Sequence, residues 1–93
     1  MWNLLYRIKM DEKEMGIFVN YFAKVMVVDI KLYDTLNLGD RLHFKGANTD
    51  FVQDVDSMET KGQKLEVGMQ GQTVGIKVKE RVRKNDKIYL VEH

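Results

Sequence analysis

V-G-M-Q-G-Q-T-V-G-I-K-V occupies residues 67–78, and L-N-L-G-D-R-L-H-F-K-G occupies residues 36–46. In each stretch, a turn that contains glycine leads directly into a short run with an apolar residue at every second position. A period of two puts successive side chains on opposite faces of a β-strand, so one face of each run would be buried. Short strands separated by such turns are typical of a small all-β barrel or sandwich.

The same alternation continues through most of the chain after residue 15, and it marks the expected core. Met58 breaks the pattern, and a β-bulge there would return its side chain to the interior. The residues expected to face inward are Met26, Val28, Ile30, Leu32, Leu42, Phe44, Phe51, Val55, Val74, Ile76, Val78, Ile88 and Leu90. We therefore predict an all-β fold, a small closed β-barrel of six or seven mostly antiparallel strands.

The domain organisation is simple, because the 93 residues contain no proline, no linker and no low-complexity segment. Residues 1–14 form an N-terminal extension in this interpretation, with one strand expected at residues 3–9, and residues 15–93 form the barrel domain. A helix stays open as an alternative for residues 77–87. Val78 and Val82 lie four positions apart there, and Lys, Glu and Arg favour helices.

The composition is that of an ordinary globular protein, 44% hydrophobic and 31% charged. The absence of cysteine excludes disulfides and cysteine-ligated zinc, and it is typical of cytoplasmic proteins. No apolar run approaches the ~20 residues that a membrane helix needs. We therefore expect a cytoplasmic location and no membrane partner.

Five stretches, taken in order, resemble the second domain of elongation factor Tu, the β-barrel of translation factors. They are G-I-F-V-N-Y-F at 16–22, L-N-L-G-D-R-L at 36–42, T-D-F-V-Q-D-V-D-S-M at 49–58, residues 65–78 ending in G-Q-T-V-G-I-K-V, and R-K-N-D-K-I-Y at 83–89. The order is most similar to that of the short stand-alone translation elongation factor-like proteins. It is also similar to a C-terminal domain of collagenase-like peptidases.

The resemblance implies a non-catalytic binding module that contacts RNA or a ribosome-associated complex. It does not extend to nucleotide chemistry. The chain contains neither G-x-x-x-x-G-K-[ST], which cradles phosphates, nor N-K-x-D, which reads the guanine base. We therefore expect no GTP hydrolysis and no nucleotide cofactor.

The charge distribution leaves room for the same function, although the net charge is only +1. Residues 69–93 carry six Lys or Arg against three Asp or Glu. Cations at alternate positions of an extended strand would form a stripe about 20 Å long that could follow a phosphate backbone. The alternative is a solvated exterior on which lysines discourage pairing between sheet edges. The expected RNA-binding residues are Lys77, Lys79, Arg81, Arg83, Lys84 and Lys87.

The alternative function is a protein-interaction accessory domain that docks on a GTPase-like or peptidase-like partner. Its distinguishing feature would be an exposed apolar patch. Tyr21 and Phe22, together with the apolar residues 2–6, are the expected partner-binding residues. Burial of these side chains would remove the reason for this alternative.

Catalysis has little support in the sequence. Only two histidines are present, Ser57 is the sole serine, and there is no cysteine. A nucleophile, a base and an orienting group cannot be assembled from these residues. We expect no enzymatic activity, no cofactor and no metal site. A small anion site is conceivable at Arg41, His43 and Lys45, which share one outward strand face.

Overall fold

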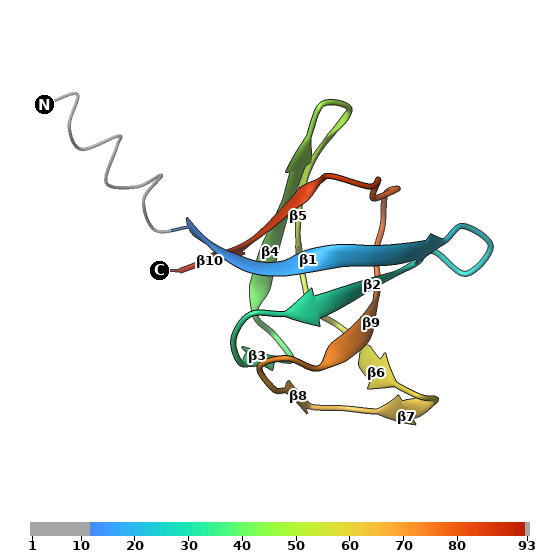
Figure 1. The fold of residues 1–93 in the computed structure, drawn as a ribbon, viewed down its shortest axis with the longest axis vertical. Helices are drawn as coiled ribbons and strands as arrows, with labels where there is room; N and C mark the ends of the chain where they lie inside the picture. Colours follow the sequence, from blue (N-terminus) through green and yellow to red (C-terminus); the bar gives the residue numbers. More distant parts are fainter. Residues whose placement is uncertain (1–11, 93) are drawn as a thin grey trace, which may run out of the picture.

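The computed structural model describes residues 12–92, which form ten β-strands connected by turns and irregular segments (Figure 1). The strands are β1 (Glu12–Phe22), β2 (Val27–Leu32), β3 (Leu36–Asn37), β4 (Arg41–Gly46), β5 (Thr49–Asp54), β6 (Met58–Thr60), β7 (Gln63–Lys64), β8 (Val67–Gly68), β9 (Thr73–Lys77) and β10 (Lys87–Val91). The helix left open for residues 77–87 does not form, since β9 ends at Lys77 and an irregular segment leads into β10. Within residues 12–92, no helix is long and apolar enough to cross a membrane.

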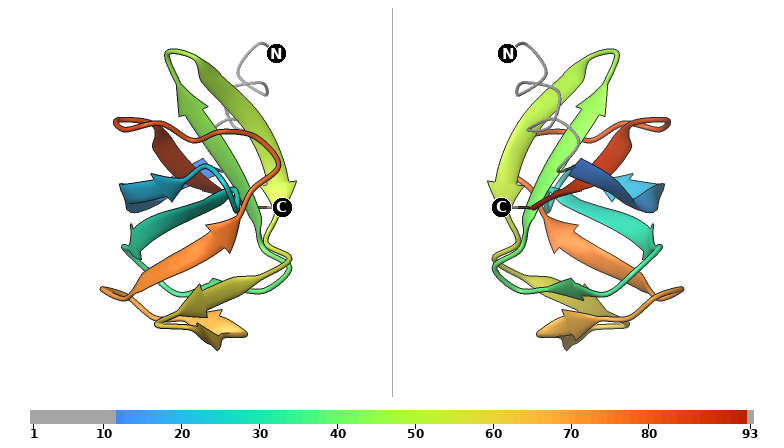
Figure 2. Two further views of the ribbon diagram at one scale, coloured as in Figure 1. Left: turned by 90° about the vertical axis from the view of Figure 1, so that its right-hand side faces the viewer. Right: turned by 90° about the vertical axis from the view of Figure 1, so that its left-hand side faces the viewer.

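Eight strands form one antiparallel sheet in the order β5-β4-β10-β1-β2-β9-β6-β7, and β3 pairs with β8 in a separate two-stranded sheet. Figure 2 shows the larger sheet strongly curved. The buried apolar side chains form one core cluster. The all-β class is confirmed, but the eight strands are not closed into a barrel, because β5 and β7 end the strand order without pairing to each other. The predicted six or seven strands are too few. Three of the strands, β3, β7 and β8, are only two residues long. A strand of that length is too short to be recognised from alternating apolar residues.

The core lies where the alternation placed it, apart from Met26, although Leu90 is only partly buried against it. Fifteen apolar side chains are buried, and Phe44 is the largest of those that are fully enclosed. Its ring stacks on Phe51, with 4.8 Å between centroids. Met26 is the exception: it lies in the turn between β1 and β2 with a φ of 54° and is only half-buried. Met58 is buried as expected, but an irregular segment at residues 55–57, rather than a bulge, returns it to the interior.

Two turns with the same construction precede β4 and β10. The Asp40 carboxylate accepts a hydrogen bond of 2.8 Å from the Asn37 amide, and the Asp86 carboxylate accepts one of 2.7 Å from the Arg83 amide. The residue before each aspartate has a positive φ, 91° at Gly39 and 75° at Asn85. Glycine and asparagine are the residues that adopt this conformation most readily. The same local construction therefore begins both strands.

A side chain joins β5 to the end of β9, where no strand pairing connects them. The Gln53 amide donates to the Lys77 carbonyl at 2.9 Å and accepts from the Lys79 amide at 2.8 Å. Gln53 therefore makes the two bonds that a neighbouring strand would otherwise supply. We call this junction the Gln53 seam.

The proposed N-terminal extension is described only from Glu12 onward. Residues 12–14 belong to β1 and pair with β10, with Glu12 opposite Val91. The strand expected at residues 3–9 lies outside the described residues.

Candidate partner-binding surface

Tyr21 and Phe22 lie at the end of β1 and point to opposite faces of the sheet, as successive strand residues do. Tyr21 is half-buried and packs against the core, and the Arg81 guanidinium lies 5.6 Å from the centre of its ring. Phe22 is 45% exposed. Of this expected pair, Phe22 is the side chain available to a partner. The apolar residues 2–6, expected to join them, lie outside the described residues.

Phe22 forms part of a hollow of about 440 Å³ on the outer face of the sheet. The β1–β2 hairpin supplies an apolar wall of Phe22, Val25 and Val27, and the turn between β6 and β7 supplies the opposite side. The intervening strand, β9, pairs with both β2 and β6 (Figure 1). Gly75 of β9 lines the hollow and has no side chain to fill it.

Two carboxylates flank Gly75 in this hollow. Asp29 of β2 and Glu59 of β6 are the two cross-strand partners of Gly75. A Cβ atom on Gly75 would lie 3.0 Å from the Asp29 Oδ1 atom and 3.7 Å from the Glu59 Cγ atom. Burial raises the pKa of the Asp29 carboxyl, and the neighbouring Glu59 charge raises it further. Within residues 12–92, neither carboxylate has an ion-pair partner.

The basic residues expected to bind RNA do not form one strand. Lys77 is the last residue of β9, the next four lie in the irregular segment, and Lys87 begins β10. Val78 and Val82 are buried, but all three residues between them, Lys79, Glu80 and Arg81, are exposed. The cations of this segment are therefore exposed, but neither the predicted strand nor its inside–outside alternation continues beyond Val78.

Several of these cations already have partners within the chain. Arg81 lies over Tyr21, and Arg83 Nη1 donates to the Asn48 carbonyl and the Thr49 hydroxyl, each at 3.0 Å. Lys87 lies 3.5 Å from a Glu14 carboxylate oxygen. These contacts within the chain fix the positions of Arg81, Arg83 and Lys87. The described structure records no ion pair for Lys77, Lys79 or Lys84.

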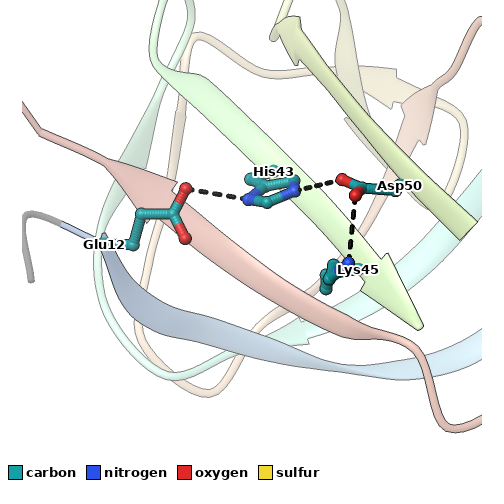
Figure 3. Close-up of polar contacts among 4 residues, drawn as sticks. All are labelled: Glu12, His43, Lys45 and Asp50. Atoms are coloured by element: carbon teal, nitrogen blue, oxygen red, sulfur yellow. Dashed lines mark hydrogen bonds and ion pairs between the residues drawn. The ribbon is translucent and has the colours of Figure 1, made fainter. Parts of the chain in front are cut away.

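A second polar group lies on the outer face of β4, around His43 (Figure 3). His43 Nδ1 lies 2.8 Å from Glu12 Oε2, and Nε2 lies 2.6 Å from Asp50 Oδ1. Lys45 Nζ lies 3.0 Å from the other Asp50 oxygen. Arg41 is likewise paired, with Asp54 at 2.9 Å. Carboxylates of this chain therefore neutralise all three of the basic residues that were considered for an anion site.

The two carboxylates decide the protonation of His43. Burial lowers the pKa of the imidazole, but the hydrogen bonds and charges of Asp50 and Glu12 outweigh burial and raise the pKa above its ordinary value of 6.5. Because each ring nitrogen faces an acceptor, the doubly protonated ring satisfies both contacts. The charged His43 therefore joins β4 to the beginning of β1 and to β5.

We expect His43→Gln to destabilise the protein at pH 5.5 and to have little effect at pH 9. A raised folded-state pKa gives a contribution that is fully present below the unfolded pKa and is lost as pH rises through the folded pKa. The loss at pH 5.5 should be about 1 kcal/mol or less, because Asp50 is open to water. Urea denaturation at both pH values measures it. Arg41→Gln is the control, since the arginine guanidinium is always charged in proteins; equal losses at both pH values for His43→Gln would contradict the assignment.

Comparison with known proteins relates this fold to peptidases. No protein-family model matches the chain. It is 35% identical over 80 residues to an uncharacterised protease of Methanocaldococcus jannaschii and 32% identical over 76 residues to a collagenase of Porphyromonas gingivalis. These matches cover 85% and 80% of the chain but only 20% and 21% of the relatives, so the chain spans about a fifth of their length.

The fold of this chain is also similar to that of a solved structure. The C-terminal domain of a Geobacillus thermoleovorans protein assigned to the U32 peptidases matches with a TM-score of 0.78 and 18% sequence identity. The match covers 84% of this chain and 91% of that domain. The chain is similar to the C-terminal domain of U32 peptidases.

These similarities correct the function expected from the sequence. The assignment to the stand-alone translation elongation factor-like proteins is wrong, and so is the RNA-binding function that it implied. The likeness to collagenase-like peptidases is confirmed. The error has a physical source. Glycine turns and period-two strands record local backbone geometry, and unrelated functions share such geometry.

The hollow over Gly75 was not predicted. Alternation identified Val74 and Ile76 as core residues, but it predicted no role for Gly75, which lies between them. A glycine in the interior of a strand often marks a place where another group approaches the backbone. Gly75 is such a glycine, so the sequence does hint at a special position there. That Asp29 and Glu59 lie opposite Gly75 can be known only from the register of the neighbouring strands.

Proposed function

We propose that this chain is a non-catalytic accessory domain that acts with a U32-type peptidase unit, on the same polypeptide or as a separate partner. The observation that carries the proposal is the match to about a fifth of a protease at 35% identity. The fold similarity to a peptidase C-terminal domain supports it. A cytoplasmic location belongs to the same proposal, since the chain needs no disulfides.

The proposed docking surface is centred on the β1–β2 hairpin. Phe22 and Val25 are 45% and 55% exposed, and Ile17 and Val19 on the preceding part of β1 are 52% and 50% exposed. Apolar side chains gathered in this way on a small domain are typical of contact with another protein. Phe22 is the expected anchor, because large aromatic residues dominate the energy of protein interfaces.

We expect the chain to bind the Geobacillus thermoleovorans U32 peptidase from which its own C-terminal domain has been removed. Isothermal titration calorimetry measures the affinity. Phe22→Asp should weaken binding by at least about thirtyfold, the loss expected for an interface anchor. Val52→Asp is the matched control, because Val52 is 40% exposed on β5, away from the hairpin. No binding, or equal losses for the two variants, would contradict the proposal.

A further inference from the structure

The hollow over Gly75 combines an apolar wall with an unneutralised pair of acids. Its volume, about 440 Å³, lies in the range of small-molecule and side-chain sites. Phe22, Val25 and Val27 form the wall, and Asp29 and Glu59 flank the glycine at the bottom. A long side chain could lie along the wall and place its end between the carboxylates.

The two acids differ from several other carboxylates of the described structure, which are paired with cations. Asp34, Asp50 and Asp54 are each paired with a cation. Asp29 and Glu59 instead repel each other across Gly75, and within residues 12–92 no cation neutralises either one. Two like charges held together without a counter-ion oppose folding. A ligand that carries positive charge would relieve this repulsion.

The chemistry of the hollow distinguishes among possible cations. Calcium requires six to eight oxygen ligands, and in residues 12–92 no group of three or more metal-ligating side chains is present. An ammonium or guanidinium group needs fewer acceptors, and its aliphatic stem gains from apolar contact. The Phe22 ring adds a face on which a cation can rest.

We propose that the hollow binds the lysine or arginine side chain of an extended peptide. The stem lies against Phe22, Val25 and Val27, and the charged end lies between the Asp29 and Glu59 carboxylates. Because Phe22 also anchors the proposed docking surface, the hollow is open to such a side chain on the free domain. The site itself is a property of the domain alone.

The lysines of this chain that surround the site do not occupy it. Lys61 lines the hollow, Lys64 is the cross-strand partner of Glu59, and Lys77 is the cross-strand partner of Val27. None of these ammonium groups lies within 4.0 Å of either carboxylate in the described structure. They leave the position between Asp29 and Glu59 to an incoming cation.

The test is an NMR titration of the ¹⁵N-labelled chain with N-acetyl-lysine N′-methylamide up to about 10 mM, a range suited to the weak binding of one side chain. We expect shifts at Asp29, Glu59 and Gly75. The norleucine analogue, which has an uncharged chain of similar length, should bind at least about tenfold more weakly because it lacks the charge-assisted hydrogen bonds. Calcium chloride at the same concentration should leave these amides unshifted.

Three variants separate the site from the fold. Asp29→Asn with Glu59→Gln should abolish the shifts while keeping or raising the denaturation midpoint, since it removes a repulsion. Gly75→Ala retains both acids but presses on Asp29 and Val27, and it should also weaken binding. Asp56→Asn, an exposed acid outside the hollow, is the control and should bind as the native chain does.

Equal affinity for the lysine and norleucine probes would overturn the proposal, as would undiminished binding by the double variant or binding of calcium alone. Absence of any shift would also overturn it. None of these results involves the peptidase. Failure here therefore leaves the docking on a peptidase unit standing, and failure of docking leaves the side-chain site standing.

Discussion

Replacing Phe44 with alanine is expected to remove about 3–5 kcal/mol of stability, a large part of the total for a domain of this size. The side chain is fully buried at the centre of β4, between Phe51 on β5 and Ile88 on β10. Alanine would lose the transfer energy of the ring, leave a cavity, and break the stacking on Phe51. Because Phe44 belongs to the one core cluster, the substitution should weaken packing throughout that cluster.

Urea denaturation followed by far-UV circular dichroism measures this loss. Phe44→Leu retains most of the apolar volume and should cost about 1.5 kcal/mol or less. Val52→Ala is the matched control from the outer face of the same hairpin, where 40% exposure limits the cost to about 0.5 kcal/mol. A Phe44→Ala variant within about 1 kcal/mol of the native chain would show that the core is not organised around this ring.

Gly46→Ala is expected to destabilise the protein by about 2–4 kcal/mol through a clash with Asp86. A Cβ atom on Gly46 would overlap the Asp86 Oδ1 atom, and it would lie 2.7 Å from Cγ and 3.3 Å from Cα. Asp86 is 7% exposed, and its other carboxylate oxygen accepts the Arg83 amide hydrogen bond. The carboxylate cannot move away without losing this bond and opening the turn before β10.

A double-mutant cycle separates this clash from a general preference for glycine. Asp86→Ala removes the obstructing carboxylate, so Gly46→Ala should cost much less in that background than in the native chain. The difference between the two costs should exceed about 1 kcal/mol, measured from urea midpoints. Additive losses would mean that Gly46 is required for its backbone conformation and not for the space above it.

The inward face of the fold was predictable because alternation is a local signal. Val28, Ile30 and Leu32 are buried on β2 as the pattern requires. Met26 followed the same pattern and was misplaced, since the chain reverses before β2 and places it in a left-handed turn position. Alternation identifies faces within a strand but not the residue at which the strand begins.

The strand order was not predictable from these signals. β10 lies between β4 and β1, and β9 lies between β2 and β6. These neighbours are brought together by packing between distant parts of the chain, which no local pattern records. The hollow depends on this order, because Asp29 and Glu59 are 30 positions apart and meet only through Gly75. The exposure of Phe22 was predictable, because a strand-end aromatic followed by a turn is easily left exposed.

The Gln53 seam has a consequence for how water reaches the interior. Elsewhere in the curved sheet, separating two neighbours requires several backbone bonds to break together, whereas here a single amide side chain holds both sides. A rotation of that side chain would free the Lys77 carbonyl and the Lys79 amide at once. We therefore expect local opening at this point to require less free energy than opening of any ladder of the sheet.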